Sequence, residues 1–262
     1  MPSQNLWRKV NIRKNCFSRL LTVILDFLWP RKCECCGNTV DRDGRHICCE
    51  CIEKIEFVAA TGCCRICSRA IENEEHEFLC DDCRRMRPKF ERAASAVHFE
   101  DEARHLIHRF KYRRALYLRD DLVDWMEGAA RVRLPLHSID FVVPMPIAWH
   151  HRLRRGYNPS AELGAAIARR LDRKLLPDVL ARKLFTRRQA GLSERERRKN
   201  VKGTFMFNNR KSGLVRGRTL LLIDDVMTTG ATLSAAAEAL KRGGASSVFC
   251  LTIARSALGT AR

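Results

Sequence analysis

No stretch of this 262-residue sequence approaches the roughly 18 uncharged apolar residues that a membrane-spanning helix needs. The best candidate, Phe17 to Trp29, is interrupted by Arg19 and Asp26, and no small-residue cleavage site of a signal peptide follows it. The sequence also contains no Gly-Lys dipeptide, which a P-loop ATPase needs in its phosphate-binding loop. These absences favour a soluble, cytoplasmic protein and argue against a P-loop ATPase.

Acidic residues are scarce outside one segment. The chain has 30 Asp and Glu against 49 Lys and Arg, a formal charge of +19, while 45% hydrophobic residues supply a core and exclude general disorder. The segment from Cys33 to Cys83 holds 12 acidic and 5 basic residues, which leaves 44 basic and 18 acidic residues elsewhere. Because this acidic segment lacks the charge for phosphate contact, we expect it to bind a protein surface, with the chain's own basic part as a candidate.

Cysteine is abundant but unevenly placed, since 11 of the 13 cysteines lie in the same acidic segment. Eight of them form pairs with two residues between the partners: Cys33 and Cys36, Cys48 and Cys51, Cys64 and Cys67, Cys80 and Cys83. Each short gap lets one turn present two sulfurs to an ion, and the longer gaps let a second pair return to the first. The spacing predicts two zinc ribbons with about two zinc ions, structural because four thiolates leave no open position.

Disulfides or reduced structural thiols are the alternatives for these cysteines, but two consecutive four-cysteine sets in a cytosolic chain favour zinc. About 50 residues with few large apolar side chains bury too little surface to fold alone, so metal binding supplies folding energy. Cys35, Cys49 and Cys63 are expected to be spare, although Cys63 is an alternative ligand to Cys64.

The apolar run Leu220 to Ile223 predicts a central parallel strand, buried on both faces, that ends in two carboxylates, Asp224 and Asp225. A threonine-rich loop follows (Thr228, Thr229, Gly230, Ala231, Thr232), then a helix from Leu233 to about Arg242 and a strand from Ser247 to Ala254. In such sheets, backbone N–H groups and hydroxyls at this edge hold a phosphate. The acids suit sugar hydroxyls or a hydrated magnesium ion. The alternatives are an ordinary turn with a threonine cap and an ATPase strand that lacks its upstream loop.

The segment from Asp224 to Thr232 resembles the phosphoribosyl pyrophosphate (PRPP) motif of type I phosphoribosyltransferases. With the cysteine segment in front, nearly the whole chain resembles the ComF family, named after competence protein F. Further matching segments occur in the family's order: Ile24 to Pro30, Phe110 to Tyr112, Val143 to Pro146, Arg155 to Asn158, Gln189 to Leu192 and Arg198 to Val201. The resemblance implies an α/β fold, a parallel-sheet type I phosphoribosyltransferase-like domain preceded by a small double zinc-ribbon domain. The expected divisions are an N-terminal amphipathic helix (1–32), the double zinc ribbon (33–89) and the phosphoribosyltransferase-like domain (90–262).

The same resemblance implies roles for individual residues. Asp224 and Asp225 would hold the ribose hydroxyls, and Thr228 to Thr232 would cradle the 5′-phosphate. The remaining implied residues are Arg152 and Arg155 for pyrophosphate, and Arg187 and Gln189 in a loop that closes over the reacting centre. Pro159 departs from the Gln that the family carries after Asn158. The implied reaction is magnesium-dependent displacement of pyrophosphate from the anomeric carbon by a base nitrogen, with an acceptor that the sequence does not identify.

Two basic segments support a second hypothesis. Arg104 to Arg119 holds six basic and no acidic residues, and Arg182 to Lys202 holds nine basic and two acidic residues. This density attracts polyanions, although aromatic side chains for base stacking are few. The alternative function is a non-catalytic factor that handles single-stranded DNA during competence, with DNA-uptake or helicase proteins as partners and the PRPP fold as a scaffold or sensor. The N-terminal amphipathic segment is expected to pack on its own domain rather than on a membrane surface.

Overall fold

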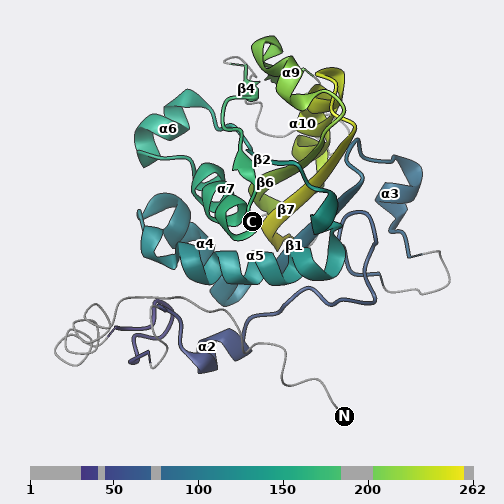
Figure 1. Cartoon of the computed structure of the whole chain (residues 1–262). Helices are drawn as coiled ribbons and strands as arrows, with labels where there is room; N and C mark the ends of the chain where they lie inside the picture. Colours follow the sequence, from purple (N-terminus) through teal and green to yellow (C-terminus); the bar gives the residue numbers. More distant parts are fainter. Residues whose placement is uncertain (1–30, 41–44, 72–77, 184–202, 257–262) are drawn as a thin grey trace, which may run out of the picture.

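The computed structural model describes residues 31–40, 45–71, 78–183 and 203–256. Within these ranges the centre of the fold is a sheet of five parallel strands in the order β1-β7-β6-β2-β3 (Figure 1). Its strands are β1 (Arg92–His98), β2 (Phe141–Pro144), β3 (Lys174–Leu175), β6 (Thr219–Met227) and β7 (Ser247–Arg255). A separate antiparallel pair is formed by β4 (Leu180–Arg182) and β5 (Phe205–Phe207). The parallel sheet confirms the predicted α/β fold class.

Helices cover both faces of the sheet. They are α2 (Cys49–Glu53), α3 (Asp81–Arg85), α4 (Asp101–Tyr112), α5 (Arg119–Arg133), α6 (Trp149–Arg155), α7 (Pro159–Arg170), α9 (Ser212–Val215) and α10 (Ala231–Arg242), with 3-10 turns at Leu116–Leu118, Leu136–Ser138 and Asn209–Lys211. On one face α5 packs on β1 and β7 while α7 packs on β2 and β6; α10 contacts β6 and β7 from the other face. No helix in the described ranges has the length and apolar content needed to cross a bilayer.

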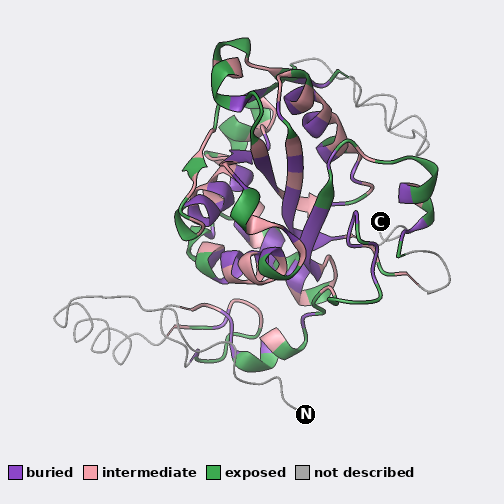
Figure 2. Cartoon of the chain, turned by 45° about the vertical axis from the view of Figure 1, so that its right-hand side comes forward, coloured by how far each residue is buried: buried purple, intermediate pink, exposed green. Residues whose placement is uncertain are grey.

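The strand β6 lies in the middle of this arrangement, which explains its unbroken apolar run. Leu221 and Ile223 join the core with α5 and α7, whereas Leu220 and Leu222 join the core with α10. Figure 2 shows the inner strands mostly buried, with half-buried residues at intervals along them. The structure extends two predicted elements: β6 continues past both acids to Met227 because Asp224, Val226 and Met227 pair with β7, and α10 begins two residues before Leu233.

The cysteine-rich segment lies outside the sheet in two separate places. We call residues 31–53 the first ribbon, residues 63–85 the second ribbon and residues 54–62 the linker. In Figure 1 the first ribbon, with α2, lies below α4 and α5, whereas the second ribbon, with α3, lies beside β1. Their cysteines join different hydrophobic clusters: Cys33, Cys48 and Cys51 belong to the α5 side, and the second ribbon's four pack with the α10 side.

The linker and the second ribbon complete the outer edge of β1. Phe57 bridges Val97 in antiparallel register, the Val58 N–H donates to the Ala96 carbonyl at 2.9 Å, and the His98 N–H donates to Glu56 at 2.8 Å. Further along, the Ala93 N–H donates to Ile66 of the second ribbon at 2.7 Å. The edge of the sheet is therefore hydrogen-bonded to the segment that precedes it in the chain.

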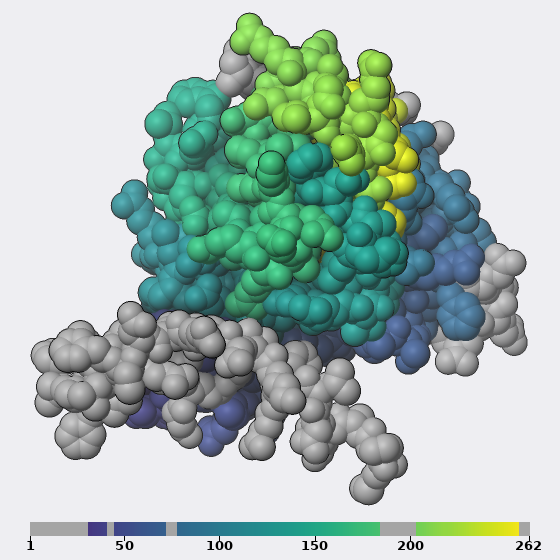
Figure 3. Space-filling view, viewed as in Figure 1, coloured from purple at the N-terminus to yellow at the C-terminus, as the bar shows by residue number. Residues whose placement is uncertain are grey.

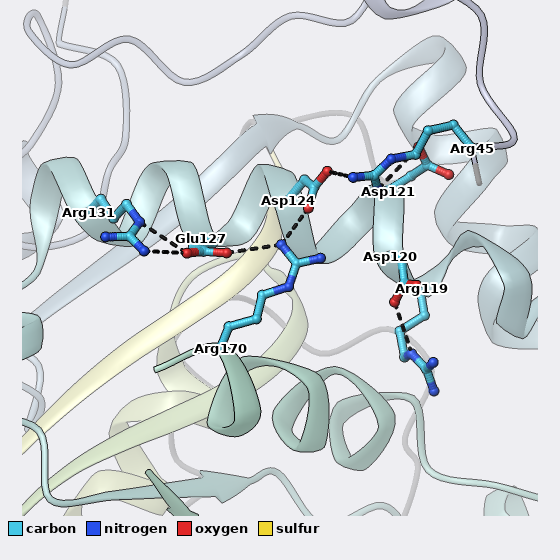
Figure 4. A network of polar contacts seen from close by, with 8 residues as sticks. All are labelled: Arg45, Arg119, Asp120, Asp121, Asp124, Glu127, Arg131 and Arg170. Atoms are coloured by element: carbon cyan, nitrogen blue, oxygen red, sulfur yellow. Dashed lines mark hydrogen bonds and ion pairs between the residues drawn. The ribbon is translucent and has the colours of Figure 1, made fainter. Parts of the chain in front are cut away.

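The first ribbon is held to α5 by a network of charges (Figure 4). Arg45 pairs with Asp124 and lies 3.8 Å from Asp121, a carboxylate that is 2% exposed and accepts the His46 N–H. Asp124 also pairs with Arg170 of α7, so one acid joins the ribbon, α5 and α7. The sequence predicted that an acidic ribbon contacts a basic domain. This contact has the opposite signs, because the ribbon provides the basic residue, Arg45, and α5 provides the acids.

A second contact of the first ribbon has the predicted charges, with the acid on the ribbon and the base on the domain. Glu34 pairs with Arg109 of α4 and accepts a hydrogen bond of 2.6 Å from the Tyr117 hydroxyl. The domain boundaries at residues 32 and 89 stay predictions, and most of the N-terminal amphipathic segment, residues 1–30, lies outside the described residues.

Candidate functional site

The eight paired cysteines form two clusters. Cys33, Cys36, Cys48 and Cys51 make one group and Cys64, Cys67, Cys80 and Cys83 the other, and the sulfurs of each group lie within 4.8 Å of one another. In each group the second cysteine pair begins a short helix, α2 or α3, while the first pair lies in a tight turn.

The geometry of both clusters fits tetrahedral zinc. The Cys36 and Cys48 sulfurs are 3.6 Å apart, as are those of Cys67 and Cys80, close to the roughly 3.8 Å between neighbouring sulfurs around zinc and far beyond a disulfide bond. Burial raises the pKa of Cys33, but backbone N–H groups of Cys36, Cys48 and Cys35 outweigh it, and this pKa falls to about 6. The thiolate is the form of cysteine that binds zinc.

Cys63 is not part of the second cluster. Its sulfur donates to the Ala59 carbonyl at 3.2 Å and accepts a hydrogen bond of 2.7 Å from Arg133 of α5. A second nitrogen of Arg133 donates to the Cys64 carbonyl at 2.9 Å, so this arginine fastens the second ribbon to α5. The sulfur of Cys64, not that of Cys63, therefore lies with the other three sulfurs, which favours Cys64 as the ligand.

A different set of polar groups gathers at the carboxyl end of β6. One oxygen of Asp224 accepts the hydroxyl of Ser160, at the start of α7, and the Asp225 N–H, both at 3.0 Å. Burial, followed by the neighbouring charge of Asp225, raises the pKa of Asp224 from 3.8 to about 7. Near neutral pH this carboxyl can therefore both hold and release a proton.

Asp225 has a cation beside it. The ammonium of Lys111, at the end of α4, lies 2.9 Å from the Asp225 carboxylate, and both side chains are 16% exposed. The Asp225 carboxylate also accepts the Val226 N–H at 2.7 Å. Lys111 belongs to a segment that the sequence matched to a family, but no role was predicted for it or for Ser160.

The loop after β6 turns sharply into α10. Gly230 has φ of +76°, a left-handed conformation that suits glycine, and its carbonyl accepts the first helical hydrogen bond, from Ser234 at 2.8 Å. The Thr229 hydroxyl accepts the Ala231 N–H at 3.3 Å, while Thr228 and Thr232 are exposed. The first turn of α10, where a helix leaves backbone N–H groups for an anion, thus follows directly after the two acids and the threonine-rich loop.

Pro159 is compatible with this site. It occupies the first position of α7, where proline is favoured, and Asn158 caps the helix by accepting the Ser160 N–H at 3.1 Å. The Asn158 amide also donates to the Met145 carbonyl after β2 at 2.9 Å. Asn158 therefore joins the end of β2 to the helix that carries Ser160.

The predicted pyrophosphate residues lie on α6. Arg152 is exposed, whereas Arg155 is half-buried with its guanidinium 4.4 Å from the ring centre of Tyr112. Among the described residues neither arginine contacts Asp224 or Asp225; Arg155 is linked to them only through Tyr112 and its neighbour Lys111. Arg187 and Gln189 lie outside the described residues.

Comparisons with known proteins match both parts of the chain. The phosphoribosyl transferase domain family matches residues 160–261, and the double zinc ribbon domain family matches residues 24–84. Competence protein F of Haemophilus influenzae is 27% identical over 89% of this chain and 100% of its own length. DNA utilization protein YhgH of Escherichia coli K12 is 30% identical over 72% of this chain and 89% of its own length. A solved adenine phosphoribosyltransferase from Saccharomyces cerevisiae is 17% identical over 56% of this chain and 72% of that chain, with a TM-score of 0.36.

Proposed function

The chain belongs to the ComF family, which joins a double zinc ribbon to a phosphoribosyltransferase domain, and from this premise we propose that it binds PRPP at the carboxyl end of β6. Asp224 and Asp225 hold the two ribose hydroxyls, and residues Thr228 to Thr232 hold the 5′-phosphate. The similarity to proteins named for competence and for DNA utilization supports a role in the handling or use of imported DNA.

One observation carries the proposal: adjacent carboxylates at the end of the central strand continue into a left-handed glycine and an N-terminal helix turn. Sugar hydroxyls need acceptors, and a terminal phosphate needs N–H donors and a positive helix end. The end of β6 provides the acceptors and the start of α10 provides the donors, with only a short loop between them. Carboxylate oxygens also suit a hydrated magnesium ion, which supplies charge neutralisation to the pyrophosphate when bound.

We further propose that the site transfers the phosphoribosyl group. A base nitrogen attacks the anomeric carbon, the bond from that carbon to the pyrophosphate oxygen breaks, and both electrons of that bond leave with pyrophosphate. The proton that the nitrogen carried is released to solvent. Lys111 provides a cation 2.9 Å from the Asp225 carboxylate. It pairs with Asp225 in the free protein, and we propose that its positive charge stabilises the departing phosphate oxygens in the complex.

The test is calorimetric titration of PRPP into the full chain, with and without magnesium. Wild-type protein binds saturably, and Asp224→Asn with Asp225→Asn abolishes binding while the zinc content stays unchanged. The matched control is Asp120→Asn with Glu91→Gln, which removes two exposed carboxylates away from the site. Persistent binding in the first double variant contradicts the assignment.

A second candidate function, single-stranded DNA binding, is favoured by the surface beside this site. The helix α6 presents Trp149 and Leu153, which are 57% and 72% exposed, together with exposed Arg152 and Arg154. Arg114, after α4, extends the cationic surface because its guanidinium lies against Gly156, at the end of α6. An exposed indole among cations is the combination that stacks bases and neutralises phosphates.

DNA binding is measured by anisotropy of a labelled oligothymidylate at rising salt. Arg113→Gln with Arg114→Gln lowers the affinity and reduces the slope of log K against log salt by about 1.4 units, about 0.7 for each lost phosphate contact. Arg169→Gln with Lys174→Gln, two exposed cations on other elements, serves as the control of equal charge. An unchanged slope in the first pair excludes this surface.

A further inference from the structure

A buried arginine connects the second ribbon to the loop after β6. Arg255 is the last residue of β7 and is 2% exposed. One of its terminal nitrogens donates to the carbonyls of Thr228 and, at 3.4 Å, Met227. The other donates to the Cys67 sulfur of the second cluster at 3.8 Å. One planar guanidinium thus touches both a predicted zinc ligand and the two carbonyls from which the loop departs.

The charge of Arg255 needs a counter-charge, because a guanidinium stays protonated and an unpaired buried charge is costly. Within the described part of the chain no carboxylate pairs with it, in contrast to Arg69 of the second ribbon, which pairs with Asp82 at 2.7 Å. A zinc ion with four thiolates carries a net charge of −2, and Cys67 provides its nearest sulfur. With zinc bound, the four thiolates of this cluster would therefore supply the counter-charge of Arg255.

Other contacts hold the second ribbon against the loop after β6 and the start of α10. Phe90, just after the second ribbon, would lie 3.6 Å from a side chain at Gly230, and the Lys89 N–H donates to the Ser234 hydroxyl of α10 at 2.9 Å. A cavity of about 320 Å³ lies between Cys67 and Cys83 on one side and residues Thr229 to Ala231 on the other. Figure 3 shows the second ribbon on the molecular surface alongside the C-terminal strand.

We propose that Arg255 is a positioning residue through which zinc in the second ribbon fixes the phosphate-holding loop, so that zinc retention and PRPP binding depend on each other. The proposal rests on the proposed PRPP site for its ligand, but the coupling between ribbon and loop can be measured without ligand. Arg133 provides the matched control, since it also binds the second ribbon, through Cys63 and Cys64, and does not contact the loop.

The first experiment uses the zinc-loaded full chain of Arg255→Lys and Arg133→Lys. A lysine keeps the charge but cannot bridge the sulfur and both carbonyls. Arg255→Lys speeds hydrogen exchange of residues 226–235 and weakens PRPP binding, each by about tenfold, whereas Arg133→Lys leaves both at the wild-type value. Unchanged exchange and affinity in Arg255→Lys overturn the proposal.

The second experiment needs only wild-type protein and therefore does not depend on a variant that folds. A chromogenic chelator extracts zinc while hydrogen exchange reports which ribbon opens. Because coupling is reciprocal, magnesium and PRPP slow release from the second ribbon and leave the first ribbon unaffected. Without ligand, exchange in residues 226–235 rises when the second ribbon's zinc leaves. If residues 226–235 stay protected from exchange after the second ribbon has lost its zinc, the proposal is overturned. If their exchange rises with zinc loss but PRPP does not bind, only the proposed function is overturned.

Discussion

The hydrogen bond from Ser160 favours the ionised form of Asp224, against burial and the charge of Asp225, and Ser160→Ala measures its contribution. Ser160 is 1% exposed and its hydroxyl lies 3.0 Å from the carboxylate, so water does not replace it freely. A hydrogen bond to a charged group contributes about 1.5–3 kcal/mol, and one pKa unit corresponds to about 1.4 kcal/mol. Loss of the hydroxyl therefore raises the pKa of Asp224 from about 7 by roughly one to two further units.

This shift appears in the pH dependence of stability. In the unfolded chain Asp224 ionises near 3.8, whereas in the folded protein it keeps its proton until about pH 7. Between these values the folded state binds more protons, so the free energy of unfolding falls as pH rises, and above pH 7 this contribution becomes constant. In Ser160→Ala the fall continues to about pH 8 or 9.

Guanidinium unfolding of the zinc-loaded protein between pH 6 and pH 9 is the assay. Asp224→Asn removes the titration and gives the baseline for all other groups. Ser95→Ala removes another buried hydroxyl, one bonded to Thr252 rather than to a carboxylate, so it lowers stability without moving the pH at which the curve flattens. If Ser160→Ala flattens at the same pH as wild type, the hydroxyl does not stabilise the ionised carboxylate and the reasoning is refuted.

Three other outcomes are expected. Elemental analysis finds about two zinc ions per chain; Cys64→Ser lowers this to about one and Cys63→Ser does not, and equal loss in both would contradict the cluster assignment. Lys111→Met leaves the Asp225 carboxylate without its cation and lowers the unfolding free energy at pH 8 by about 2 kcal/mol, measured by guanidinium unfolding; an unchanged value would show the pair to be fully solvated. Gly243→Ala places a methyl group 2.5 Å from the Phe207 ring and lowers stability by about 1–3 kcal/mol, whereas Gly213→Ala meets nothing within 4 Å and serves as its control.

The sequence predicts those parts of the fold that depend on local pattern. Leu220 to Ile223 is apolar without interruption because α7 and α10 cover opposite faces of the strand. An uninterrupted apolar run of this kind can be recognised in the sequence alone. The cysteine spacing likewise predicts both clusters, since each short gap determines where two sulfurs meet. The length of β6 was not predictable, because pairing with β7 carries the strand through two acids that alone would favour a turn.

The groups that sequence analysis missed act across long separations. Lys111 and Ser160 come from α4 and α7, and only the packing of those helices on the sheet brings them to the acids. Arg255 ends an apolar strand, a position where an arginine is normally taken as the first exposed residue; its partner Cys67 is 188 residues away. For Lys111, the match to a family segment was the one available signal.

The hydrogen bonds between β1 and the residues before it have a consequence for how the polypeptide can be divided. A chain that starts at residue 90 retains the whole parallel sheet but loses Glu56, Val58 and Ile66, which occupy the free side of β1. The row of N–H and C=O groups left open is a template on which a second molecule can add its own strand. The segment before residue 90 thus covers this strand edge and prevents self-association through it. Removal of the segment exposes an edge that favours aggregation.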